Sequence, residues 1–190
     1  LGAVDTVLCM GAALSQAAGF YHAFKGQEKR PDIVATIGDS TFFHAGVPAL
    51  VDAVVQDVRF VLVILDNRTT AMTGHQPTPA TGSGAKGEPL QSMDIAALVQ
   101  ACGVKFCKQG DPYQLKEFTA LVKEAVAYSR EHGPAVVISR HPCLLDRTRK
   151  NEQHQPVIVQ VNDNCDGCGY CVKHFECPAL SLDEAEEHVQ

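Results

Sequence analysis

The hydrophobic and polar positions of this chain follow two periods, one typical of helices and the other of buried strands. Short apolar runs bounded by turn-forming residues predict strands at 33–37, 60–65, 104–107 and 135–139. Between them, apolar residues recur at helical spacing over 10–24, over 47–54, from Asp94 onward and over 112–130. Strands that alternate with helices in this way predict an α/β fold built on a parallel sheet.

The alternation of strands and helices stops near residue 140, which suggests how the chain is divided into domains. We expect an α/β domain over residues 1–145 and a small second unit over residues 157–190. Residues 146–156 read as a linker, because five charged residues lie between Asp146 and Glu152. The first residue is Leu1 rather than Met, which predicts a processed or truncated chain.

The composition excludes several classes of protein. The chain has 190 residues, of which 45% are hydrophobic and 20% charged, an ordinary balance for a soluble globular protein. A net charge of −6 without a dense basic run argues against a nucleic-acid partner. The apolar run 60–65 is too short to span a membrane. Four scattered cysteines, which we expect to be free thiols in the reducing cytoplasm, are Cys9, Cys102, Cys107 and Cys143.

Four further cysteines lie close together near the C-terminus in the pattern C-x2-C-x2-C-x5-C-P. They are Cys165, Cys168, Cys171 and Cys177. Thiolates at this spacing suit an iron–sulfur cluster, whereas a zinc site more often uses two Cys pairs that are farther apart. In two-cluster ferredoxins the fourth cysteine of such a motif binds the other cluster. Cys177 therefore either completes its own cluster across the longer gap or serves a second cluster.

Polar residues follow two successive predicted strands at the points where those strands end. Gly-Asp-Ser occupies residues 38–40, and Asp-Asn-Arg-Thr occupies residues 66–69. Ligands of α/β sheets bind at the carboxyl ends of the strands, and the oxygens of Asp39 and Asn67 suit Mg²⁺ with a diphosphate. The same residue types are also common turn formers after strands. Spacing alone leaves both interpretations open.

These residues resemble the signature that binds Mg²⁺ and thiamine diphosphate, usually Gly-Asp-Gly followed by Asn-Asn. Ser40 stands in place of the third Gly and Asp66 in place of the first Asn. Together with segments 38–46 and 65–76 and the cysteine motif, they make the chain similar to the 2-oxoacid:ferredoxin oxidoreductases. Within that family it resembles the thiamine-diphosphate-binding part of the indolepyruvate ferredoxin oxidoreductase α subunits, and the resemblance covers essentially the whole chain.

The resemblance implies a set of functional residues. The side chains of Asp39 and Asn67 and the carbonyl of Thr69 would hold Mg²⁺. The further residues that it places beside the cofactor are Met10, Gly11, Gly38, Ser40, Thr73 and Gly74. His44 is a candidate catalytic acid or base because imidazole titrates near neutrality, although a loop histidine is often simply solvated. The four motif cysteines would hold a [4Fe–4S] cluster in a ferredoxin-like segment.

The resemblance also implies a reaction. A 2-oxoacid, in particular an arylpyruvate such as indolepyruvate, would be oxidatively decarboxylated to an acyl-CoA, with electrons passing through [4Fe–4S] clusters to ferredoxin. A pyrimidine-binding domain and a second subunit would have to come from other segments or chains. Alternative functions are a subunit that acts on pyruvate or another 2-oxoacid, a non-catalytic electron-transfer module, and a non-oxidative thiamine decarboxylase with a zinc-bound tail.

Overall fold

The chain forms two compact units. The computed structural model describes residues 4–143, 161–162, 164–174, 180–183 and 188–189. The larger unit is Leu8–Thr148, and the smaller combines Leu1–Val7 with Arg149–Gln190. The predicted linker over 146–156 lies outside the described residues.

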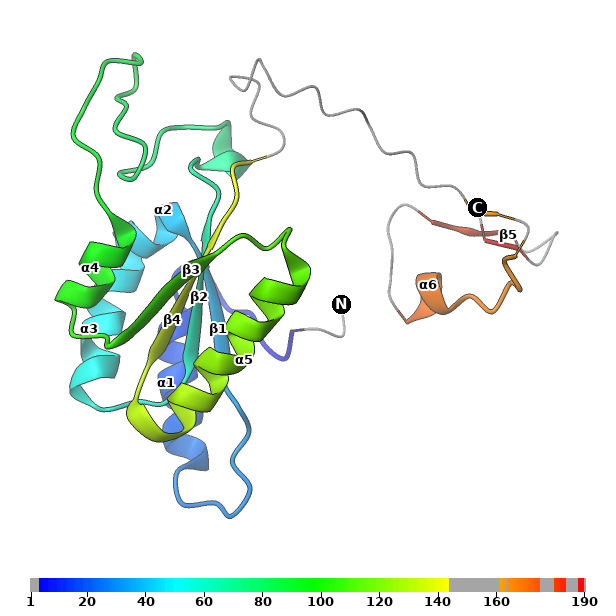
Figure 1. The fold of residues 1–190 in the computed structure, drawn as a ribbon, viewed down its shortest axis with the longest axis horizontal. Helices are drawn as coiled ribbons and strands as arrows, with labels where there is room; N and C mark the ends of the chain where they lie inside the picture. Colours follow the sequence, from blue (N-terminus) through cyan, green and yellow to red (C-terminus); the bar gives the residue numbers. More distant parts are fainter. Residues whose placement is uncertain (1–3, 144–160, 163, 175–179, 184–187, 190) are drawn as a thin grey trace. The chain divides into compact units, whose positions relative to one another are not determined.

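A four-stranded parallel sheet forms the centre of the larger unit (Figure 1). Its strands in spatial order are β1 (Val34–Gly38), β2 (Val61–Asp66), β4 (Ala135–Arg140) and β3 (Phe106–Gly110). Gly38 pairs with Leu65 and Asp66 pairs with Arg140, so the carboxyl ends of β1, β2 and β4 meet at one edge. The α/β fold and the parallel sheet are therefore confirmed.

Helices cover both faces of the sheet, as Figure 1 shows. On one face lie α1 (Ala13–Phe24), α3 (Val47–Val55) and α4 (Ile95–Ala101), and on the other lies α5 (Leu115–His132). Alternate residues of β2 pack into the hydrophobic cores on the two faces of the sheet, because successive side chains of a strand point to opposite faces. Leu62 and Ile64 pack with the three helices, and Val61 and Val63 pack with α5.

Several element boundaries differ from the sequence prediction by a few residues; α5, for example, is Leu115–His132 where 112–130 was expected. The first helix begins at Ala13 rather than at residue 10, because Gly11 has a φ of +89°, a left-handed conformation that interrupts a right-handed helix. Met10 is consequently 76% exposed. The strand predicted over 104–107 is β3 at Phe106–Gly110, although Val104 is buried.

A continuous helical run follows β1 and replaces the loop that the sequence suggested there. It consists of α2 (Asp39–Thr41), the π-helix η1 (Phe42–Gly46) and α3. Pro48 gives a physical reason for the π turn. Proline has no N–H to donate to the carbonyl four residues earlier, and its ring crowds that carbonyl, which belongs to His44. The regular α pattern is therefore interrupted around His44, a feature frequent at functional sites.

The smaller unit contains few described elements. They are α6 (Tyr170–Lys173) and the antiparallel pair β5 (Leu182–Asp183) and β6 (His188–Val189). The ferredoxin-like character of this unit stays a prediction. No helix within the described ranges is both long and apolar enough to cross a membrane.

Candidate functional site at the carboxyl edge of the sheet

Asp39 begins the helical run after β1 and is only 2% exposed. Its Oδ1 accepts a hydrogen bond from the Ser40 N–H at 2.7 Å. Its Oδ2 is also buried and has no hydrogen-bond partner within the part of the chain that the structure describes. Burial raises the pKa of Asp39 to about 6; the nearby Asp66 carboxyl also raises it, whereas the Ser40 N–H opposes the rise. A buried carboxylate oxygen without a protein partner fits a site for a cation.

The turn after β2 lies next to Asp39, as the sequence predicted, because β1 and β2 are neighbours in the sheet. The Asn67 Oδ1 accepts a hydrogen bond from the Thr69 N–H at 3.1 Å, and Thr69 is buried. The Thr70 hydroxyl donates to the Ser40 Oγ at 3.0 Å. This last contact joins the loop after β2 to the start of the helical run after β1. The structure thus brings the two predicted halves of the Mg²⁺ site together.

The loop that carries Thr73 and Gly74 closes on itself. The Thr70 N–H donates to the Gln76 carbonyl at 2.9 Å, and the His75 N–H donates to the Thr70 carbonyl at 3.1 Å. The Gln76 side chain holds the tip by donating from Nε2 to the Thr73 carbonyl at 2.6 Å. Gly74 has a φ of +114°, which a residue with a side chain rarely adopts. The loop is therefore built as a short closed turn beside the strand ends.

His44 lies on η1 and is exposed. Its neighbour Ala45 approaches the segment before α1 so closely that a Cβ added to Gly11 would lie 2.8 Å from the Ala45 Cβ. The predicted Met10–Gly11 element therefore lies against the helical turn that carries His44. His44 is a residue of a π-helix rather than of the loop that the sequence suggested, and its position is fixed by helical hydrogen bonds.

A cavity of about 230 Å³ opens at the same edge of the sheet, on the β4 side of the Asp66–Asn67 turn. Two rings meet in its wall, because the centroids of Tyr113 and His141 are 4.0 Å apart. The His141 Nδ1 is 3.1 Å from the Asp111 Oδ1, which fixes the orientation of the imidazole. The residues that line this cavity are Leu65, Asp66, Asn67, Pro112, Tyr113, Ser139, His141, Pro142 and Cys143.

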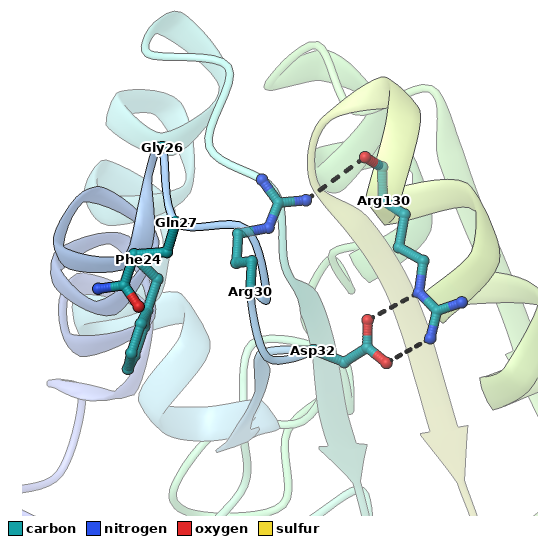
Figure 2. A pocket seen from close by; sticks show the side chains of 6 residues that line it. All are labelled: Phe24, Gly26, Gln27, Arg30, Asp32 and Arg130. Carbon is teal, nitrogen blue, oxygen red and sulfur yellow. Dashed lines mark hydrogen bonds and ion pairs between the residues drawn. The ribbon is translucent and has the colours of Figure 1, made fainter.

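A larger cavity, of about 380 Å³, lies at the opposite, amino edge of the sheet (Figure 2). Arg130 donates from Nε and Nη2 to the two carboxylate oxygens of Asp32, at 2.8 and 2.6 Å. Arg30 donates to the Arg130 carbonyl at 3.4 Å. These polar groups therefore satisfy one another. Ligands of open α/β sheets bind at the carboxyl edge, so the smaller cavity and the Asp39 region form the better candidate site.

Three of the four motif cysteines fall within the described residues. Cys165, Cys168 and Cys171 are free thiols. In the described ranges no group of three or more His, Cys, Asp or Glu side chains is close enough to hold a metal ion, so the structure does not gather these cysteines into a site. Cys177 lies outside the described residues. The iron–sulfur cluster accordingly stays a prediction.

Arg140 is a residue of the site that the sequence interpretation missed. Its Nε donates to the Asp66 Oδ2 at 2.6 Å, and the Asp66 side chain is fully buried. The sequence could point to Asp66, because this carboxylate directly follows an apolar run. No sequence pattern pointed to Arg140, since the two residues are 74 positions apart and meet only because β4 lies beside β2.

Comparison with known proteins connects this geometry to a family. Residues 3–139 match the family model described as the thiamine pyrophosphate enzyme C-terminal TPP binding domain. The chain is 43% identical to the indolepyruvate oxidoreductase subunit IorA of Archaeoglobus fulgidus, over 96% of this chain and 28% of that protein. It is 41% identical to the subunit of the same name from Methanothermobacter marburgensis, over 94% of this chain and 27% of that protein.

A solved structure shares the fold. The 2-oxoglutarate:ferredoxin oxidoreductase from Magnetococcus marinus aligns with a TM-score of 0.58 at 22% identity, over 70% of this chain and 45% of that chain. The present chain spans less than a third of the length of the two IorA relatives. The family match covers more than half of the chain and includes β1, β2 and both turns that form the candidate site. The chain therefore belongs to the thiamine pyrophosphate enzymes and carries their C-terminal TPP-binding domain.

Proposed function

We propose that this chain is the thiamine-diphosphate-binding part of a larger oxidoreductase that oxidatively decarboxylates a 2-oxoacid, with indolepyruvate or another arylpyruvate as the substrate. The names of the IorA relatives support this choice of substrate. The single observation that carries the proposal is the buried Asp39 Oδ2, which lacks a hydrogen-bond partner among the described residues and lies beside the Asn67 turn. In a TPP-binding domain, such an oxygen suits the metal ion that accompanies the diphosphate.

The proposed Mg²⁺ ligands are the Asp39 carboxylate, the Asn67 side-chain oxygen and the Thr69 carbonyl. All three are oxygen donors, and Mg²⁺ usually keeps further positions for water and phosphate oxygens. Asp39 and Thr69 are buried, which would protect the ion from exchange with bulk water. The remaining residues proposed to lie beside the cofactor are Met10, Gly11, Gly38, Ser40, Thr73 and Gly74.

Bound thiamine diphosphate supplies the carbon chemistry of decarboxylation, which amino-acid side chains do not provide. We assign His44 the transfer of a proton at the substrate, because its imidazole is exposed and lies on a helical turn next to Gly11. The closed loop from Thr70 to Gln76 would keep the cofactor side of the site in place. The backbone of this loop is held by its own hydrogen bonds, and the backbone of His44 belongs to the helical turn η1.

The proposed electron path uses the cysteine motif. Cys165, Cys168, Cys171 and Cys177 would bind a [4Fe–4S] cluster that accepts electrons one at a time and passes them to ferredoxin. Coenzyme A would receive the acyl group. A pyrimidine-binding domain and a second subunit would be supplied by other segments or chains, in line with the small share of the relatives that this chain spans.

Replacing Asp39 tests the cofactor site. In the full-length protein, Asp39→Asn should abolish measurable binding of thiamine diphosphate in the presence of Mg²⁺, as followed by isothermal titration calorimetry. The matched control is Asp52→Asn, which removes an exposed carboxylate on α3 and should leave binding unchanged. Equal affinity in Asp39→Asn and the parent would exclude the proposed metal site.

Replacing His44 tests the catalytic assignment. His44→Gln should lower kcat with indolepyruvate by roughly a hundredfold or more, the effect typical of a lost general acid or base, without weakening cofactor binding. His132→Gln, at the exposed end of α5, is the control. Comparing kcat/KM for indolepyruvate, pyruvate and 2-oxoglutarate in the parent tests the substrate. A preference for either of the small acids would overturn the arylpyruvate assignment.

Elemental analysis of the full-length protein tests the electron path. About eight irons and eight acid-labile sulfides per chain would mean two [4Fe–4S] clusters, and about four of each would mean that Cys177 completes its own cluster. Cys168→Ser should lower the iron content in either case. Zinc without iron or sulfide would exclude the ferredoxin-linked reaction.

A further inference from the structure

A buried carboxylate lies directly beside the proposed metal ligands and is not one of them. The Asp66 side chain has no solvent exposure, and its Oδ1 accepts a hydrogen bond from the Arg68 N–H at 3.3 Å. Its Oδ2 accepts one from the Arg140 Nε at 2.6 Å, and the Arg140 side chain is 28% exposed. The position departs from the Asn-Asn pattern of the thiamine diphosphate signature, and an Asn here would need no cationic partner.

Arg140 belongs to a segment that holds the Asp66–Asn67 turn from the side opposite to Asp39. Strand order places β1 on one side of β2 and β4 on the other. Beyond the last pair of the sheet, the His141 N–H donates to the Asp66 carbonyl at 3.2 Å, and the Cys143 N–H donates to the Asn67 carbonyl at 3.1 Å. The backbone and the side chain of this segment therefore fix the same turn.

The two buried acids at this edge, Asp66 and Asp39, differ in their charged neighbours. Asp66 is the last residue of β2 and Asp39 directly follows β1, so the two acids lie at the ends of neighbouring parallel strands, where two negative charges disfavour each other. Within the described residues, Asp66 has an ion-pair partner, whereas Asp39 has none and keeps an Oδ2 without a hydrogen bond. Neutralising Asp66 leaves Asp39 as the negative group available to an external cation. Without Arg140, two uncompensated carboxylates would share one buried site, and Asp66 would be free to turn toward the metal.

We propose that Arg140 is a positioning residue of the cofactor site, a role that rests on the proposed function. It neutralises Asp66 and holds the turn so that Asn67 and Asp39 face one Mg²⁺. In this role Arg140 would act through Asp66, its ion-pair partner, rather than by contact with the cofactor or the substrate. The requirement for Arg140 therefore comes from the charge of Asp66 and should disappear with that charge.

The test compares single and double variants of the full-length protein with its partner subunits. Calorimetric titration gives the dissociation constant of thiamine diphosphate at fixed Mg²⁺ and of Mg²⁺ at fixed thiamine diphosphate. Arg140→Met should weaken both by roughly tenfold, because neighbours in one ion-pair network couple strongly. Asp66→Asn should change them by less than about threefold, because the part-exposed Arg140 guanidinium can then be solvated by water. Asp66→Asn/Arg140→Met should match Asp66→Asn, because it leaves neither charge of the pair.

A second arginine–aspartate pair in the same unit provides a matched control. Arg130 and Asp32 form a bidentate ion pair at the amino edge of the sheet, as Figure 2 shows. Arg130→Met and Asp32→Asn should leave both dissociation constants unchanged. An equal loss of affinity in Arg130→Met would assign the effect to general stability and overturn the role of Arg140.

The remaining outcomes also decide the question. Parent affinity in folded Arg140→Met would overturn the proposal even if its Tm falls, because a purely structural arginine changes Tm alone. If Arg140→Met does not fold, the double variant carries the test, and binding much weaker than that of Asp66→Asn would overturn the proposal. A parent protein that binds neither ligand would instead overturn the proposed function, so the two failures are distinguishable.

Discussion

Gly11 offers a quantitative test of how the segment before α1 meets the π-helix. Its φ is +89°, and a Cβ at this position would lie 2.8 Å from the Ala45 Cβ. We expect Gly11→Ala to destabilise this region through two separable effects, the strain of the backbone conformation and the new steric contact. The Ala45 Cβ is attached directly to the helix backbone, so it cannot rotate away as the end of a long side chain could.

The magnitude of each effect follows from the geometry. A left-handed conformation costs a residue with a side chain about 1–2 kcal/mol, and the lower entropy of the unfolded chain offsets about 0.4–1 kcal/mol of that. An overpacked contact typically costs about 1–3 kcal/mol. The sum predicts a loss of roughly 1–5 kcal/mol for Gly11→Ala.

Gly26, at the other end of α1, separates the two effects. Its φ is +91°, and a Cβ there would meet nothing within 4 Å. Gly26→Ala should therefore show only the conformational part, roughly 1 kcal/mol. In a background of Ala45→Gly, which itself costs about 1 kcal/mol, the cost of Gly11→Ala should fall to the same value.

Native-state hydrogen exchange of the full-length protein measures these costs locally. Peptides that cover residues 8–24 and 39–55 report the free energy of opening of α1 and of the helical run with η1. The reasoning is refuted if Gly11→Ala and Gly26→Ala cost the same, or if Ala45→Gly leaves the cost of Gly11→Ala unchanged.

Three further predictions concern stability. Asp94→Ala removes the side chain that caps α4 by accepting the Ala97 N–H at 2.8 Å, and should cost about 1 kcal/mol in local exchange of the 95–101 peptide. Leu50→Ala leaves a cavity at a fully buried position and should lower the free energy of unfolding by about 2–5 kcal/mol, measured by denaturant unfolding. A loss below about 1 kcal/mol, as expected for a surface position, would contradict the burial of Leu50. The hydrogen bond from Arg130 holds the pKa of Asp32 below its ordinary value of 3.8. The ion pair therefore stabilises the fold above pH 3.8, and this stabilisation is lost as the pH falls through the lowered pKa of Asp32. The Tm of Arg130→Met should be slightly below that of the parent at neutral pH and equal to it in acid. A difference in Tm that persists in acid would contradict the ion pair as its cause.

Much of the fold could be predicted from the sequence because its signals are local. The apolar run 60–65 identifies a strand covered on both faces, and Leu62 and Val63 do pack into opposite cores. The exception is Leu65, which is 47% exposed where the strand reaches the carboxyl edge. The closeness of Asp39 to the turn that contains Asn67 could also be predicted, because consecutive strands joined by a helix usually lie side by side in the sheet.

The helical run after β1 could be predicted only in part. Apolar spacing identified α3, but residues 39–46 carry Gly, Ser and Thr, which are typical of turns. In the folded unit, Phe42 is fully buried against the core, and this packing draws the segment into the helix. Burial of a single large side chain outweighed the weak local preferences, and it placed His44 on η1 rather than in a loop.

The sequence by itself determined the four strands of the parallel sheet, the helices α1, α3, α4 and α5, the acid and amide at two strand ends and the cysteine spacing, because each depends on residues a few positions apart. The tertiary structure alone decided which distant residues complete the site. The order β1-β2-β4-β3 brings Arg140 to Asp66 and leaves the Asp39 Oδ2 without a hydrogen bond in the described chain. Such contacts depend on which strands become neighbours, and that choice is made by packing of the whole sheet rather than by any local pattern.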